Sequence, residues 1–129
     1  MKSYRDLDIY KQAFELSIHI RIKTLELPNP DRYEVGSQLR RSSQSIKDNI
    51  VEGYGRRRYK SDFIKFLVYS YSSLLESLSQ CEFLNIIHPN NEWDKISIEL
   101  DILGARINKF IKFVETNWKT ERSDETTDN

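Results

Sequence analysis

The most regular stretch of this sequence is residues 93–118, WDKISIELDILGARINKFIKFVETNW. Its large apolar side chains recur every three or four residues, at Trp93, Ile96, Leu100, Leu103, Ile107, Phe110, Val114 and Trp118. Because an α-helix turns once in about 3.6 residues, this spacing puts all of them on one face. The stretch is therefore predicted to be a long helix with one face packed on other helices.

Three further helical segments are predicted before it. One, after residue 60, carries the stripe Phe63, Leu67, Ser70, Leu74, Leu78 and Cys81, widened by Ile64, Tyr71 and Leu75. The first runs from about Asp8 to Glu26, with a broader and less regular face of Tyr10, Ala13, Phe14, Ser17, Ile18, Ile20 and Leu25. The second runs from Arg32 to Glu52. Four Gly and three Pro in 129 residues are too few for a turn-rich β fold.

Turn signals separate these segments at residues 27–31, 53–55 and 88–91. Pro lacks an N–H and clashes with the preceding turn, so a helix ends before each Pro-containing stretch. The short connections force consecutive helices to run antiparallel. The predicted fold is all-α, an up-down-up-down four-helix bundle over residues 1–118, and the polar residues 119–129 are predicted to be a disordered tail.

Side chains that favour helix starts lie next to these turns. Asp31 is expected to cap the second helix and Ser61 the third, with Asp62 near the positive end of the helix dipole. Asn90 or Asn91 is expected to cap the fourth.

The composition limits the kind of protein. A length of 129 residues holds one domain. One Cys and two His cannot form a four-ligand Cys/His metal site, and no apolar stretch is long enough for a secretion signal or membrane helix. We therefore expect a cytoplasmic protein without a membrane partner.

The formal net charge of zero is an average over two unlike halves. Residues 1–75 hold 14 Lys and Arg against 9 Asp and Glu, whereas residues 76–129 hold 6 against 11. A uniformly basic nucleic-acid-binding protein is excluded, but a polarised one is not.

The second segment has a polar stripe beside its apolar one. The apolar stripe is Val35, Leu39, Ser42, Ile46, Ile50 and Gly53, and the polar stripe is Gln38, Arg41, Ser45, Asn49 and Glu52. Arg40, Gln44 and Lys47 fall on the far side and are expected to be exposed. The polar stripe has three open interpretations. It is a packed polar seam (either inside the bundle or between subunits), a solvated flank of the helix, or a ligand site.

The run at residues 27–57, LPNPDRYEVGSQLRRSSQSIKDNIVEGYGRR, resembles the signature of the four-helix-bundle proteins encoded by intervening sequences in bacterial 23S ribosomal RNA genes. The matching positions are Leu27, Pro28, Arg32, Gln38, Leu39, Arg41, Ser45, Ile46, Asn49, Ile50, Glu52, Gly53, Tyr54 and Gly55. The resemblance implies a bundle that assembles as a homopentamer. The accessory protein of diversity-generating retroelements is similar to this family, which by analogy implies a pentamer that binds nucleic acid and a reverse transcriptase.

The sequence departs from the family pattern at two places. Ser42, Ser43 and Lys47 stand where many members have two small apolar residues and a proline. Tyr71 and Ser72 stand where members often carry an Arg-Gly pair, and the loss of that arginine weakens the transfer of a nucleic-acid surface.

Basic and aromatic residues gather after the second segment. The candidate nucleic-acid-binding residues are Arg56, Arg57, Arg58, Tyr59 and Lys60, together with Arg40, Arg41 and Lys47 in the segment before. Lys and Arg contact phosphates and Tyr stacks on bases, so the set is typical of such a surface. The alternative is that the arginines solvate a loop and pair with nearby acids.

Catalytic signals are weak. Asp48 and Glu52 lie one helical turn apart, a spacing usual for surface charges, and His19 and His88 have no local partner. Cys81 is at a stripe position and reads as a small core residue. We expect no enzyme, no cofactor and no metal, but a self-associating bundle that binds nucleic acid or, alternatively, serves as a scaffold for a protein partner.

Overall fold

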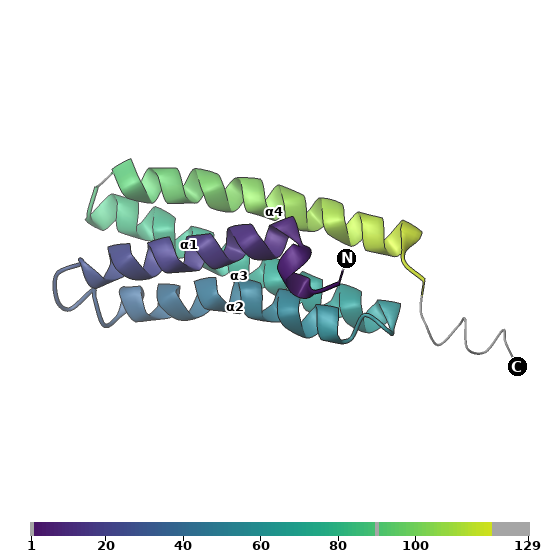
Figure 1. Ribbon diagram of the computed structural model, residues 1–129. Helices are drawn as coiled ribbons and strands as arrows, with labels where there is room; N and C mark the ends of the chain where they lie inside the picture. Colours follow the sequence, from purple (N-terminus) through teal and green to yellow (C-terminus); the bar gives the residue numbers. More distant parts are fainter. Residues whose placement is uncertain (1, 90, 120–129) are drawn as a thin grey trace, which may run out of the picture.

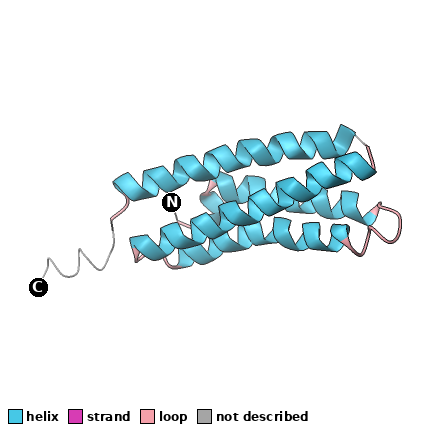
Figure 2. Ribbon diagram, turned by 180° about the vertical axis from the view of Figure 1, so that it is seen from behind, coloured by secondary structure: helices cyan, strands magenta, loops and turns pink. Residues whose placement is uncertain are grey.

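Most of the described residues lie in helices. The computed structural model describes residues 2–89 and 91–119 (Figure 1). A short 3-10 helix, η1 (Tyr4–Asp6), precedes α1 (Asp8–Leu25), α2 (Val35–Gly55), α3 (Lys60–Ile87) and α4 (Asn91–Asn117). Figure 2 shows these helices joined by short loops, with no strand in the part of the chain that is described. The all-α prediction is confirmed, and the four helices lie side by side as a bundle.

Each helix packs on two others. Among the described residues α2 contacts α1 and α3, and α4 contacts α3 and α1, whereas α1 and α3 do not pack on each other. In Figure 1 α1 accordingly lies in front of α3. The outward sides of α1 and α3 therefore belong to different faces of the bundle.

The stripe predicted for α4 forms one wall of the core. Six of its eight residues are buried, namely Trp93, Ile96, Leu100, Leu103, Ile107 and Val114. Phe110 is half-buried against this core, as is Trp118 just beyond the end of the helix. Phe63 of α3 packs edge-on against both rings, with centroid distances of 5.9 Å to Phe110 and 5.1 Å to Trp118.

The face predicted for the first helix is partly wrong. Phe14, Ile18 and Leu25 are 42%, 46% and 43% exposed, although Ala13, Ser17 and Ile20 are buried as expected. The buried stripe of α1 also includes Ile9, Leu16 and Thr24. The error has a physical cause. Apolar residues also occupy the outward side of α1, so the spacing of apolar residues does not identify the buried face.

The predicted helix starts are also corrected. α2 begins at Val35 rather than Arg32, without a side-chain cap, and the Asp31 carboxylate instead bonds to His88. Ser61 lies inside the first turn of α3, which begins at Lys60. Asn90 and the side chain of Asn91 lie outside the described residues, so their capping role stays a prediction.

The Gly53-Tyr54-Gly55 stretch, predicted to be a turn, is the last part of α2. Gly53 is needed there for close packing, because a Cβ at this position would lie 3.1 Å from the Cβ of Phe66 and 3.2 Å from the carbonyl oxygen of Phe63. The chain turns instead over residues 56–59.

The predicted domain ends at residue 118, and α4 ends at Asn117. The predicted tail lies outside the described residues from position 120 onward. Within the described part of the chain, none of the helices combines the length and the apolar character required to span a bilayer.

Candidate functional site

A polar seam runs through the contact between α2 and α3. The Ser42 hydroxyl lies 2.8 Å from the Ser77 hydroxyl and donates to the Gln80 side-chain oxygen at 3.1 Å. One turn along, the Ser45 and Ser73 hydroxyls lie 2.9 Å apart. The seam therefore joins two helices of the same chain.

Part of the predicted polar stripe belongs to this seam. Ser45 is half-buried, and the Asn49 amide donates to its carbonyl and hydroxyl oxygens at 2.9 Å and 3.0 Å. Gln38 is exposed but accepts from the Gln80 amide of α3 at 3.4 Å, whereas Arg41 and Glu52 are exposed at the flank.

The residues of α3 that pair with this stripe were not predicted from the sequence. Ser73, Ser77 and Gln80 recur at helical spacing, as does Ser70, whose hydroxyl donates to the Ile46 carbonyl at 2.7 Å. This repeat of polar residues in an otherwise apolar helix is the sequence signal that could have identified them. These hydroxyls are small enough for close helix contact, and they are hydrogen-bonded to one another and to nearby carbonyls.

The basic corner is the turn between α2 and α3, comprising Arg56, Arg57, Arg58, Tyr59 and Lys60. Arg57 maintains the shape of this turn. Its guanidinium donates to the Tyr54 carbonyl at 3.0 Å and lies 4.1 Å from the centre of the Tyr54 ring. The Arg57 carbonyl in turn accepts from the indole N–H of Trp118 at 3.2 Å, which ties the corner to the end of α4.

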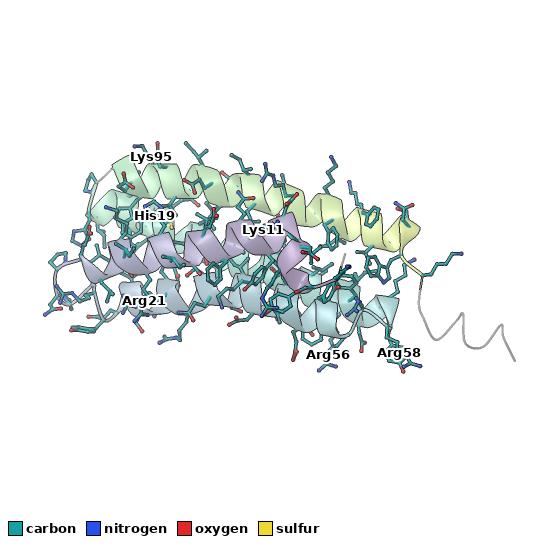
Figure 3. All side chains as sticks on the ribbon, in the orientation of Figure 1. Lys11, His19, Arg21, Arg56, Arg58 and Lys95 are labelled. Carbon is teal, nitrogen blue, oxygen red and sulfur yellow. The ribbon has the colours of Figure 1, made fainter. Side chains whose placement is uncertain are left out.

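Arg56, Arg58 and Tyr59 of the basic corner are exposed, whereas Lys60 is half-buried. The Arg56 guanidinium is loosely paired, at 3.9 Å from Glu52 and 4.0 Å from Asp62. Arg58 is exposed, and Tyr59 is 39% exposed. Figure 3 shows Arg56 and Arg58 together at one end of the bundle, away from His19 and Arg21 at the other. This corner therefore has cationic and aromatic groups at its surface.

The three basic residues predicted on α2 do not join the corner. Arg40 lies 16 residues before Arg56, which corresponds to about 24 Å along the helix. Its guanidinium donates to the Thr24 hydroxyl at 2.9 Å and the Arg32 carbonyl at 3.0 Å, and burial lowers its pKa. Lys47 pairs with Asp48 at 2.7 Å, while Arg41 is exposed and bonds to Ser37.

The expectation that the far side of α2 is exposed is wrong. Arg40, Gln44 and Lys47 are all half-buried. Arg40 is held against α1 and the preceding loop, because the chain returns past this side of α2.

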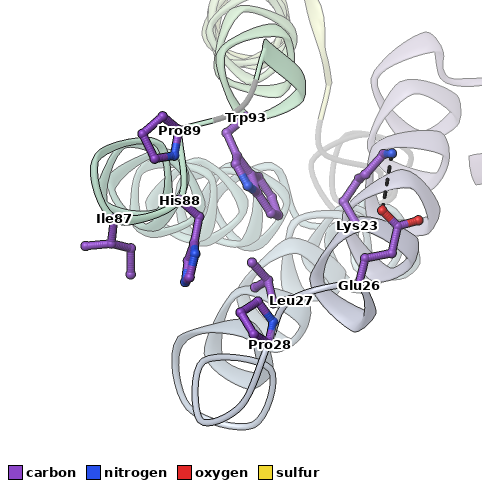
Figure 4. A pocket seen from close by; sticks show the side chains of 8 residues that line it. All are labelled: Lys23, Glu26, Leu27, Pro28, Ile87, His88, Pro89 and Trp93. Atoms are coloured by element: carbon purple, nitrogen blue, oxygen red, sulfur yellow. Dashed lines mark hydrogen bonds and ion pairs between the residues drawn. The ribbon is translucent and has the colours of Figure 1, made fainter.

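Both histidines bind carboxylates near the end of the bundle opposite the basic corner. His19 lies 3.2 Å from Glu92, and His88 lies 2.7 Å from Asp31. His88 also lines a hollow of about 390 Å³ (Figure 4). Its charged groups are engaged, since Lys23 pairs with Glu26 at 3.5 Å. No group of three or more metal-binding side chains occurs in the described part of the chain.

Cys81 is fully buried in the core. Burial, and secondarily the charge of Glu82, raise the pKa of its thiol to about 12. The thiol therefore stays protonated near neutral pH and is a poor nucleophile.

Comparisons with known proteins agree with this architecture. Residues 5–109 match the family of 23S rRNA-intervening sequence proteins. A crystal structure of a protein of unknown function from the S23 ribosomal protein family of Bacteroides thetaiotaomicron is similar, with a TM-score of 0.73, 20% identity, and coverage of 81% of this chain and 95% of that chain. At this identity the likeness concerns the fold alone. None of the curated proteins compared with the chain matches it.

Proposed function

This chain belongs to the 23S rRNA-intervening sequence protein family, and on that premise we propose that it is a non-enzymatic subunit of a homo-oligomer that binds nucleic acid at its basic corner. The oligomer in this proposal is the pentamer expected from the resemblance, built from up-down-up-down bundles. Hydrogen-bonded pairs in reversed order, such as Ser42 with Ser77 and Ser45 with Ser73, support that topology.

The observation that carries self-assembly is the outward side of α1. Phe14, Ile18, Ile22 and Leu25 recur at helical spacing and are between 42% and 53% exposed. A continuous apolar stripe on a solvent-facing helix marks an interaction site more often than scattered apolar residues do. A second copy of the chain would cover this surface.

The observation that favours nucleic acid is the basic corner. Arg56, Arg58 and Lys60 bring three cationic side chains within five residues, next to the partly exposed ring of Tyr59. Repetition of this corner around an oligomer would multiply the contacts to a single polyanion. The buried, protonated Cys81 thiol fits the non-enzymatic part of the proposal.

Assembly is tested first, by light scattering at micromolar concentration. We expect a mass near five times the 15.4 kDa of the chain. Ile18→Glu is expected to lower that mass, whereas Ile18→Leu, which keeps the apolar surface, is expected to leave it unchanged. A monomeric wild type would overturn the oligomer.

Binding is tested by fluorescence anisotropy with single-stranded RNA, single-stranded DNA and duplexes over a range of salt concentrations. Replacing Arg56, Arg58 and Lys60 together by Gln should weaken binding and reduce the salt slope by about 0.7 for each lost single-strand contact. The matched control replaces Lys95, Lys109 and Lys112 of α4 by Gln.

The outcome separates the two candidate functions. If an oligomeric wild type shows no binding even at low salt, the nucleic-acid role is wrong and the scaffold for a protein partner takes its place. If the α4 control weakens binding as much as the corner variant, the corner is not the binding site.

A further inference from the structure

The outer stripe of α1, comprising Phe14, Ile18, Ile22 and Leu25, is accompanied by two cations. Lys11 lies three residues before Phe14, and Arg21 lies four residues before Leu25, so both share the outward side of the helix. Figure 3 shows them towards opposite ends of α1. Within the described residues neither forms an ion pair. The stripe is therefore an apolar surface bordered by positive charge.

A groove of the opposite charge lies between α3 and α4. This acidic groove has a volume of about 600 Å³ and is lined by Leu78, Glu82, Ile86, Asp94, Ile98 and Asp101, among others. Ile86 is 78% exposed and Ile98 is 54% exposed, which leaves a large apolar surface open.

The charge of the acidic groove is not neutralised by its surroundings. Glu82, Asp94 and Asp101 form no ion pair within the described part of the chain. Residues 76–105, which form most of both walls, hold six acidic residues and one basic residue, Lys95. An occupant of this groove must therefore supply apolar side chains together with cations.

We propose that the outer stripe of α1 of one copy docks in the acidic groove of the next copy. The inference rests on the proposed self-assembly and names the two surfaces that meet. The α3 wall of the groove runs from Leu78 to Ile86, eight residue steps or about 12 Å, so it can cover most of the stripe, whose eleven steps from Phe14 to Leu25 span about 16 Å. Lys11 and Arg21 then face the carboxylates of Glu82, Asp94 and Asp101.

The proposed contact joins two different surfaces. α1 and α3 do not pack on each other in the bundle, so the stripe and the groove belong to different sides of one copy. A contact between unlike surfaces is heterologous, and it generates a ring when the rotation between copies closes. Each copy thus presents one stripe and one groove, and a closed ring leaves neither exposed.

Charge reversal tests this pairing without knowledge of the exact register. The stripe-reversed variant carries Lys11→Glu and Arg21→Glu, and the groove-reversed variant carries Glu82→Lys, Asp94→Lys and Asp101→Lys. Each variant alone sets like charges against each other, so its dissociation constant should rise at least about tenfold. Sedimentation velocity measures this, with circular dichroism to establish that the monomer is folded.

Two combinations of the charge-reversed surfaces give the diagnostic result. A fully reversed variant with all five changes should assemble again like the wild type. An equimolar mixture of the stripe-reversed and groove-reversed variants should recover association between unlike copies, but not a closed ring of five, because two alternating variants cannot close a ring with an odd number of subunits. The control, Lys2→Glu with Lys119→Glu, changes the net charge as much as the stripe-reversed variant and should assemble like the wild type. Ile22→Ser, at a position 53% exposed, should weaken assembly without any change of charge.

The outcomes distinguish this inference from the proposed assembly. An oligomeric wild type whose mass is insensitive to both reversals would overturn the pairing and leave assembly through other surfaces. The pairing would also be overturned if both variants lose assembly and neither the fully reversed variant nor the mixture of the two variants recovers association. A monomeric wild type would overturn the assembly itself.

Discussion

Ser42 and Ser77 face each other across the contact of α2 and α3, with their hydroxyl oxygens 2.8 Å apart and both side chains buried. The two hydroxyls also reach a carbonyl of their own helix, at Leu39 and Ser73 respectively. Every buried polar side-chain atom in the described part of the chain has a partner. This part of the contact between α2 and α3 is thus polar, and its buried side-chain groups are hydrogen-bonded.

Removing one of these hydroxyls should destabilise the bundle. Ser77→Ala deprives the Ser42 hydroxyl of a buried partner, and we expect a loss of about 1 kcal/mol in the free energy of unfolding. Urea unfolding of Ser77→Ala, Ser42→Ala and the double variant measures the coupling between the two positions. Ser79→Ala, at an exposed position of α3, is the control. Strict additivity of the two single effects would contradict an energetic link across the seam.

The stripe of α4 gives a prediction about the apolar core. Leu103 is completely buried, so Leu103→Ala should lower the free energy of unfolding by about 2–5 kcal/mol through lost transfer energy and a residual cavity. Ile102→Ala, at the adjacent position that is 46% exposed, should cost much less. Urea unfolding measures both variants. The comparison is made at a protein concentration below that of assembly, so that no second subunit covers Ile102. Similar losses for the two variants would then mean that Ile102 is buried within the single chain.

The core face could be predicted where one apolar stripe is longer and more regular than the others. α4 also has exposed apolar residues, such as Ile98 and Ile102, but its stripe from Trp93 to Val114 keeps steps of three and four and is buried as predicted, apart from the half-buried Phe110. α1 carries Phe14 and Ile18 on its outward side, so its periodicity no longer identifies the core face. These outward apolar residues, which made the core face of α1 hard to predict, form the surface through which we expect copies to associate.

The candidate site was harder to predict because it depends on contacts between segments. Asp31 has the chemistry of a helix cap, but it bonds to His88, which is 57 residues away in sequence. Arg40 fell on the polar side of its helix, yet the returning chain half-buries it. Local propensity contains no information on which distant group will compete for a side chain.

Arg40 provides a prediction that separates a structural arginine from a surface one. Its guanidinium bridges the Thr24 hydroxyl and the Arg32 carbonyl, at 2.9 Å and 3.0 Å. Because hydrogen bonds to a charged group contribute about 1.5–3 kcal/mol, Arg40→Gln should lower the free energy of unfolding by an amount in that range. Arg41→Gln, at the adjacent exposed position, should change it by less than about 0.5 kcal/mol. Equal effects in thermal or urea unfolding would contradict a bridging role for Arg40.

Cys81 makes the stability of the fold sensitive to alkaline pH. The fold raises the pKa of its thiol from an ordinary value of 9.0 to about 12, so the buried form is neutral. Below pH 9 the thiol is protonated in both the folded and the unfolded chain, and its contribution is fully present. Between pH 9 and pH 12 only the unfolded chain ionises, which lowers the free energy of unfolding by about 1.4 kcal/mol per pH unit.

Cys81→Ala isolates this contribution from the Lys and Tyr residues that titrate in the same range. At neutral pH the wild type should be the more stable protein, because the variant leaves a small cavity in the core. Its advantage should shrink as the pH rises above the ordinary thiol value, since only the wild type has a thiol to ionise on unfolding. Urea unfolding of both proteins at increasing pH measures the difference. A difference that stays constant up to the raised pKa would mean that the thiol is not held neutral, and that Cys81 is open to solvent in the folded protein.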